Sequence, residues 1–223
     1  MRRLVSCLPA GFRDHYRSNW RTLQSELKVI AGKLSRQFSR PPFPGSTKTN
    51  LHLGCGSIYH SSFINIDGFP APHIHYIRAI DNLSIFADET VDFIYASHCL
   101  EHFSYSKIPD VLREWFRVLK KGGKLRLSVP DFDLLLKIYR DTSHDLCSIE
   151  GCLLGAQNRK LNFHHSTFNK SHLSHHLRNS GFLDIYEWHP GVDELTVSND
   201  YSNFKIELNG SHYPISLNLE AKK

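Results

Sequence analysis

The chain has 223 residues, of which 40% are hydrophobic and 22% are charged, a composition typical of a globular protein with one sizeable core. No apolar run approaches the roughly 20 residues that a membrane-spanning helix needs, and the apolar stretch at residues 4–10 is too short for a signal peptide. We therefore expect a cytoplasmic protein. The five cysteines follow no spacing typical of a disulfide framework or a zinc site.

The net charge of +5 is unevenly distributed along the chain. Residues 1–48 contain ten Lys or Arg against Asp14 and Glu26, whereas the rest of the chain carries 17 basic and 20 acidic residues. Proteins that bind nucleic acid usually carry the basic face on the binding domain itself. We therefore expect no nucleic-acid partner for the main domain.

The basic N-terminal part has the pattern of an amphipathic helix, because apolar residues recur every three or four positions. The prolines and glycine of residues 40–45 end this helix, since proline lacks an amide donor and restricts the residue before it. We place a domain boundary there, between a basic arm at 1–45 and a domain at 46–223. The helix packs on the protein's own body or on a twin subunit, or it lies on a membrane surface through residues 16–40. Its apolar stripe consists of Trp20, Leu23, Leu27, Ile30, Leu34 and Phe38.

From residue 50 the sequence alternates between short apolar strands and amphipathic helices. This alternation predicts an α/β domain with a doubly wound, mostly parallel sheet. A helix is expected at 108–119, with Gly122 and Gly123 as its C-cap, and another at 170–180, ended by Gly181. The predicted strands are 51–53, 63–66, 91–97, 124–129, 183–188 and 215–220.

A glycine pair follows the first predicted strand, and an acidic residue ends the second. Gly54 and Gly56 would let a ligand approach the backbone at the carboxyl end of the sheet, and Asp67 could accept both hydroxyls of an adenosine ribose. The third glycine of the dinucleotide fingerprint is replaced by Tyr59, which disfavours a pyrophosphate-containing cofactor. S-adenosylmethionine contains adenosine but no phosphate, and it fits this shorter pattern better.

Taken together, the motifs of residues 50–133 resemble those of the class I methyltransferases. Within that class they are similar to methyltransferase type 11 domains found among bacterial polysaccharide-synthesis proteins. The resemblance implies a Rossmann-like sheet of seven strands that ends in an antiparallel hairpin, formed by residues 183–188 and 215–222. It is carried by Leu51-His52-Leu53-Gly54-Cys55-Gly56, Phe63-Ile64-Asn65-Ile66-Asp67, Val91-Asp92-Phe93-Ile94-Tyr95-Ala96-Ser97-His98, Leu100-Glu101-His102, Arg117-Val118-Leu119-Lys120-Lys121-Gly122-Gly123-Lys124-Leu125 and Val129-Pro130-Asp131.

The resemblance also implies which residues bind S-adenosylmethionine. The first glycine motif would line the methionine part, Asp67 would hold the ribose, and His98 would cover the methyl group. The family usually has an acidic residue where this chain has His52, and Leu-Pro-Phe where it has Ser84-Ile85-Phe86. The expected cofactor-binding residues are Leu53, Gly54, Cys55, Gly56, Asp67, Asp81, Asn82, Leu83 and His98.

Methyl transfer depends mainly on positioning the acceptor, but a hydroxyl acceptor also needs a base for its proton. His98 and His102 are the candidate bases, with Glu101 as an orienting partner. Two alternatives stay open. Glu101 could instead be a carboxylate at a helix N-terminus, where the helix dipole stabilises it, and His98 could contact the cofactor without moving a proton.

Five histidines between residues 164 and 176 raise the question of a metal. His172 and His176 lie four residues apart on a predicted helix, but the pattern lacks the glutamate of HExxH, and an exposed polar helix face explains it equally well. We assign no metal ligand. His164 and His165 could instead reach over the cleft toward the acceptor.

These observations favour an enzyme that methylates a small molecule or a sugar, such as a polysaccharide precursor, with S-adenosylmethionine as cofactor. The sugar comes from the resemblance alone. A second hypothesis is an inactive scaffold that keeps the cofactor fold and docks through its basic arm. A third, a nicotinamide oxidoreductase, is weakened by Tyr59 and by the predicted hairpin.

Overall fold

The computed structural model describes residues 48–223, except residues 159–160, 193–194, 196, 198–199 and 209. The predicted basic arm at 1–45 and its amphipathic helix lie outside the described residues. Among the helices that are described, none has the length and apolar character required to span a bilayer.

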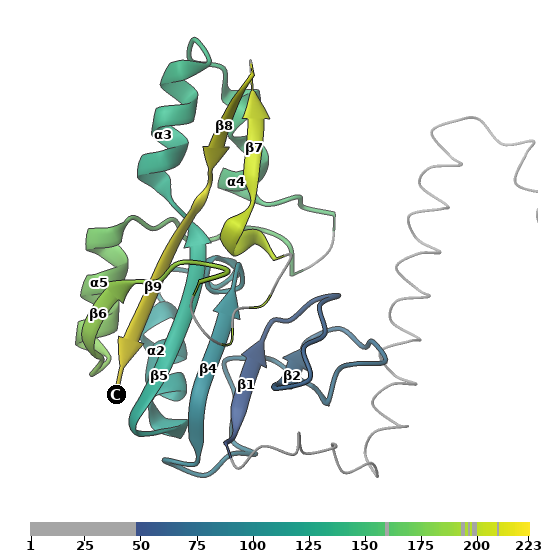
Figure 1. Ribbon diagram of the computed structural model, residues 1–223, viewed down its shortest axis with the longest axis vertical. Coiled ribbons are helices and arrows are strands. Elements are labelled where there is room, and N and C mark those ends of the chain that lie inside the picture. Colours follow the sequence, from purple (N-terminus) through teal and green to yellow (C-terminus); the bar gives the residue numbers. More distant parts are fainter. Residues whose placement is uncertain (1–47, 159–160, 193–194, 196, 198–199, 209) are drawn as a thin grey trace, which may run out of the picture.

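A seven-stranded sheet forms the centre of the molecule, in the order β3-β2-β1-β4-β5-β9-β6 (Figure 1). Neighbouring strands from β3 to β5 are parallel, and β9 runs antiparallel to both β5 and β6. This is the predicted Rossmann-like sheet with its antiparallel C-terminal pair. The strands are β1 (Asn50–Leu53), β2 (Ile64–Asp67), β3 (Tyr76–Ile77), β4 (Val91–Ser97), β5 (Leu119–Pro130), β6 (Leu183–Glu187) and β9 (Ser216–Lys222).

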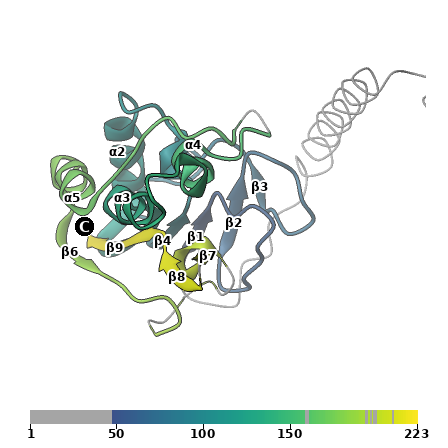
Figure 2. The same cartoon turned by 90° about the horizontal axis from the view of Figure 1, so that it is seen from above.

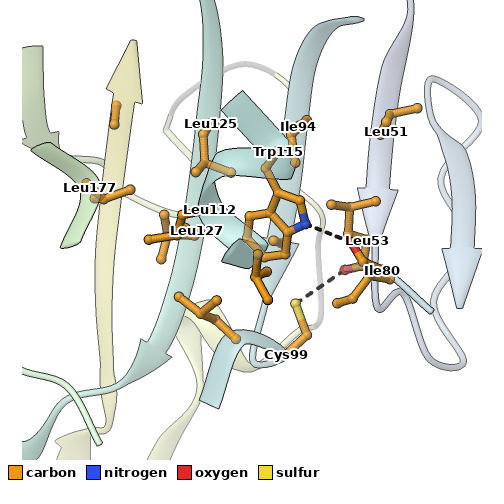
Figure 3. Packing of buried hydrophobic residues seen from close by; sticks show 14 of the residues in the cluster. Leu51, Leu53, Ile80, Ile94, Cys99, Leu112, Trp115, Leu125, Leu127 and Leu177 are labelled. Carbon is orange, nitrogen blue, oxygen red and sulfur yellow. Dashed lines mark hydrogen bonds between the residues drawn. The ribbon is translucent and has the colours of Figure 1, made fainter. Parts of the chain in front are cut away.

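One face of the sheet packs against α2 (Ile108–Val118) and α5 (Lys170–Asn179). All the labelled α-helices lie on this side when the sheet is viewed from above (Figure 2). Trp115 of α2 lies at the centre of this core, where its indole Nε1 donates a hydrogen bond to the carbonyl oxygen of Ile80 at 2.8 Å (Figure 3). Trp115 and Tyr95 are both fully buried.

The opposite face of the sheet is aromatic. Strands place alternate residues on opposite faces, so β4 turns Ile94 toward the helices and Tyr95 toward this second cluster. The phenol of Tyr95 donates a hydrogen bond to Asp200 at 2.5 Å, which ties the segment after β6 to the sheet. The buried members of the cluster are Phe63, Phe93, Tyr95, Trp188 and Val197.

The predicted glycine C-cap of the 108–119 helix is wrong. Helix α2 ends at Val118, and Leu119 is already extended and paired with Val91 of β4. Leu119 is fully buried, so strand pairing and core packing end the helix before the glycines are reached. Gly122, with φ of 76°, instead forms an irregular turn within β5 and donates its amide to Lys223 at 2.8 Å.

A small lobe lies beyond the carboxyl ends of β4 and β5 (Figure 1). It consists of α3 (Phe132–Asp141), α4 (Glu150–Leu154) and the hairpin of β7 (Lys205–Leu208) and β8 (Ser211–Pro214). Its own apolar cluster joins the helices to the hairpin; the buried members are Leu135, Ile138, Ile149 and Ile215. The lobe therefore covers the edge of the sheet where the predicted site residues lie.

Candidate functional site

Three loops that carry predicted site residues meet at one edge of the sheet. Gly54 follows β1, Asp67 ends β2 and His98 follows β4, and these strands are neighbours in the order β2-β1-β4. Chain order reverses between β1 and β4, which is the topological switch point where ligands bind in open α/β sheets. The sheet therefore brings residues from three separate motifs to the position expected for a cofactor.

The two glycines of the first loop are required for different reasons. Both have left-handed backbones, with φ of 63° at Gly54 and 56° at Gly56. A Cβ at Gly54 would lie 2.7 Å from the Cβ of Cys99, so the β1 and β4 loops pack directly on one another there. A Cβ at Gly56 would meet nothing within 4 Å. Gly54 closes the loop onto the protein, and Gly56 borders open space.

The carboxylate of Asp67 is anchored but retains acceptor capacity. Its Oδ2 accepts the amide of Gly56 at 2.8 Å, and its Oδ1 accepts the amide of Phe69 at 2.8 Å. An ionised carboxylate has about four acceptor positions, so these two bonds leave room for two further donors. The side chain therefore fits the two hydroxyls of a ribose, and the open space beside Gly56 fits a ligand passing the loop.

The remaining residues expected at the cofactor differ in exposure. Leu53, Cys55 and Leu83 are buried, and burial raises the pKa of the Cys55 thiol. Asn82 is exposed, and its side-chain oxygen accepts hydrogen bonds from Arg78 and from the amide of Ser84. Asp81 is partly exposed. Within the 81–83 segment, only the side chains of Asp81 and Asn82 are thus accessible to a ligand, while Leu83 belongs to the core.

His98 has a left-handed backbone, with φ of 49°, directly after β4. Its Nε2 lies 2.8 Å from the hydroxyl of Ser216, and that hydroxyl donates its single hydrogen to the carbonyl of Tyr201 at 2.7 Å. Ser216 must therefore accept from His98, which places a hydrogen on Nε2 and leaves Nδ1 with a lone pair in the neutral ring. Tyr201 also packs on the imidazole, with ring centroids 5.4 Å apart.

Glu101 lies in the short 3-10 helix η2 (Leu100–His102) and is 1% exposed. Its Oε1 is 3.4 Å from Nδ1 of His98 and 3.9 Å from Nε2 of His164. Neither carboxylate oxygen has a hydrogen-bond partner among the described residues. Burial acts to raise the pKa of Glu101, but the imidazoles of His98, His102 and His164 lower it more when they carry a proton, so its pKa lies below the usual value.

His102 and His164 are both oriented by backbone carbonyls. Nδ1 of His102 lies 3.0 Å from the oxygen of Phe163, and Nδ1 of His164 lies 2.9 Å from the oxygen of Cys152. Because a carbonyl only accepts, each Nδ1 carries a hydrogen, and in the neutral ring Nε2 keeps its lone pair. Burial lowers the pKa of His164, which favours its neutral form. One ligand atom each from Glu101, His102 and His164 lie within 4.8 Å of one another.

The structure thus brings the three predicted catalytic residues together and adds His164. From the sequence, His164 could reach over the cleft, but no pattern pairs it with Glu101. The other histidines of that stretch lie elsewhere: His172 and His176 are neighbours on α5, with their Nε2 atoms 3.1 Å apart. In the part of the chain that the structure describes, no third ligand joins this pair.

Comparisons with known proteins agree with this fold. Residues 68–127 match a family model described as a methyltransferase domain. No curated protein sequence matches the chain. A SAM-dependent methyltransferase from Archaeoglobus fulgidus is 17% identical with a TM-score of 0.51, covering 92% of this chain and 100% of its own. One from Methanosarcina mazei is 18% identical with a TM-score of 0.50, covering 79% and 92%. These solved structures have the same fold.

Proposed function

We propose that this chain, a class I S-adenosylmethionine-dependent methyltransferase by its matched domain segment and its fold, methylates a small molecule or a sugar precursor. The matched segment and the fold support the predicted enzyme class and cofactor. The observation that carries the proposal is the meeting of the glycine loop, Asp67 and His98 at the switch point of the sheet.

The cofactor would be held by residues of all three loops. The space beside Gly56 would take its amino-acid part, and the free acceptor positions of Asp67 would take the ribose hydroxyls. His98 would lie near the reacting methyl group. S-adenosylmethionine supplies a carbon already activated by its sulfonium, so the main task of the protein is to align the acceptor.

The acceptor that we propose is a hydroxyl group. Glu101, His98 and His102 gather two imidazoles and a buried carboxylate at the carboxyl end of β4, and such groups suit an acceptor whose proton must be removed. The lobe of α3, α4 and the β7–β8 hairpin stands over this edge and would limit the size of the acceptor. The acidic balance of residues 49–223 disfavours a nucleic-acid acceptor.

The first test is isothermal titration of the purified chain with S-adenosylmethionine, S-adenosylhomocysteine and NAD in parallel. We expect micromolar binding of the first two and none of NAD. An acceptor screen with radiolabelled methyl donor then follows, beginning with sugars and small phenols. Cofactor binding without turnover on any acceptor would favour the scaffold hypothesis, and binding of NAD alone would overturn the cofactor assignment.

A further inference from the structure

A buried carboxylate and three imidazoles converge next to the proposed methyl-transfer site. The carboxylate of Glu101 faces Nδ1 of His98 at 3.4 Å and Nε2 of His164 at 3.9 Å, and one ring nitrogen of His102 lies within 4.8 Å of the ligand atoms of Glu101 and His164. In the neutral form of each imidazole the hydrogen lies on the nitrogen that is bonded to Ser216, Cys152 or Phe163; these bonds are 2.8, 2.9 and 3.0 Å long.

This arrangement is unfavourable unless something positive lies among the lone pairs. A buried carboxylate normally takes hydrogen bonds or a counter-charge, because burying an unpaired charge is strongly unfavourable. Glu101 is 1% exposed, and neither of its oxygens has a hydrogen-bond partner among the described residues. The backbone also holds the cluster in place, since the amides of His165 and Ser166 donate to the carbonyl of Glu101 at 2.8 and 3.1 Å.

We propose that Glu101, His102 and His164 bind a divalent transition-metal ion, with His98 beside it. Two imidazoles and one carboxylate suit Zn²⁺, Mn²⁺ or Co²⁺ better than Mg²⁺ or Ca²⁺, which prefer oxygen ligands. Ligands about 2.1 Å from one ion lie roughly 3 to 4 Å apart, and the 3.9 Å between Glu101 Oε1 and His164 Nε2 falls in that range. The carbonyl bonds to both Nδ1 atoms are the outer contacts that orient metal-binding histidines.

The role of the ion rests on the proposed function. Three protein ligands leave positions open, and an acceptor hydroxyl bound there would lose its proton more readily because the cation stabilises the alkoxide. That proton would pass to water. The alkoxide oxygen would then form a bond to the methyl carbon as the carbon–sulfur bond breaks, and the electron pair of that bond would stay on the sulfur.

The test is metal binding by the untagged full chain after chelator treatment, measured by calorimetry with Zn²⁺, Mn²⁺, Co²⁺ and Mg²⁺ separately. We expect one equivalent of a transition metal to bind, and Co²⁺ to give an absorption spectrum typical of nitrogen and oxygen ligands. Glu101→Gln and His164→Ala should weaken binding more than about 100-fold. His172→Ala/His176→Ala, which removes the exposed pair on α5, should leave it unchanged.

Several outcomes would overturn the inference. These are absence of stoichiometric binding, equal affinity in Glu101→Gln, or loss of binding only in the α5 double variant. Because Glu101 is buried, His102→Gln at a partly exposed position provides a second variant if Glu101→Gln does not fold. Titration of the same samples with S-adenosylmethionine distinguishes the metal site from the proposed function. Cofactor binding without metal binding would refute the metal site and leave the proposed function standing. Metal binding without cofactor binding would refute the cofactor site.

Discussion

The amide of Gly56 donates a hydrogen bond to the carboxylate of Asp67 at 2.8 Å, so the loop after β1 is held by the last residue of β2. Asp67 therefore has two tasks in the proposed site. It fixes the conformation of the glycine loop, and it offers its remaining acceptor positions to a ribose.

Replacing Asp67 should weaken cofactor binding to an extent that depends on the substitution. Asp67→Ala removes both tasks, and we expect a loss of about 1.5 to 3 kcal/mol in binding S-adenosylmethionine, the range for hydrogen bonds to a charged group. Asp67→Asn keeps one acceptor oxygen and should fall between the wild type and Asp67→Ala. Calorimetric titration of folded variants measures this, and unchanged affinity in Asp67→Ala would refute the ribose assignment.

The two loop glycines should respond differently to the same substitution. Gly54→Ala forces a side chain into a left-handed backbone and against Cys99, so it should lower the free energy of unfolding by about 2 to 4 kcal/mol. Gly56→Ala has only the backbone penalty, about 1 to 2 kcal/mol, but its methyl group enters the space proposed for the cofactor. Urea unfolding and cofactor titration of both variants should show a stability defect in the first and a binding defect in the second. The reverse pattern would contradict the proposed path of the cofactor.

The buried ion pair between Arg126 and Glu220 joins β5 to β9, with Nη2 and Oε2 2.5 Å apart. Removing one partner leaves a buried charge, so Glu220→Leu should destabilise the protein by about 3 to 5 kcal/mol. The double variant Arg126→Met/Glu220→Leu should lose less than the sum of the single variants. Asp141→Asn, which breaks an exposed pair with Lys137, is the matched control and should change stability little. Strict additivity in the double-mutant cycle would show that the pair is not coupled.

His52 should make the folded state sensitive to acid. Burial lowers its pKa to about 4 from the ordinary value of 6.5, and its Nδ1 has no hydrogen-bond partner among the described residues. Between these two pH values the unfolded chain binds a proton that the folded chain does not, so stability rises with pH across this window. The contribution of His52 is about 3 kcal/mol, complete above pH 6.5 and lost as the pH falls toward 4.

The variant His52→Leu tests this contribution. Urea unfolding at pH 7 and pH 4.5 should show that the free energy of unfolding falls less between these pH values than it does in the wild type. The substitution His175→Gln, at an exposed position, should leave this decrease unchanged. Equal pH dependence in His52→Leu and the wild type would show that other groups cause the acid sensitivity.

The sheet could be predicted because its strands carry their signals locally. The apolar run Val91–Ser97 is buried on both faces, and it was predicted with the bounds that the structure shows. The two residues of β3 and the β7–β8 hairpin were missed, since short strands with a mixed pattern give no clear period. The glycines at 122–123 misled the prediction of the helix end, because the buried Leu119 favours pairing with β4 over another helical turn.

Part of the candidate site could likewise be predicted from the sequence, and part could not. Gly54, Gly56 and Asp67 could be found from the sequence because each follows or ends a strand, and parallel strands bring such positions to one edge. The contact of His164 with Glu101 could not be found. It depends on the packing of the segment after α4 against η2, where His102 meets the carbonyl of Phe163, 61 residues further along the chain. No local pattern encodes such a contact.

The position of β9 determines when the sheet can be completed. This strand lies between β5 and β6, and β6 pairs with no other strand among the described residues. A nascent chain that has left the ribosome only as far as β6 can therefore form the parallel half of the sheet, while β5 keeps an open edge and β6 has no partner. Assembly of the finished sheet must wait for the residues from Ser216 onward. Until then, the open edge of β5 is the surface that a chaperone would need to shield from other nascent chains.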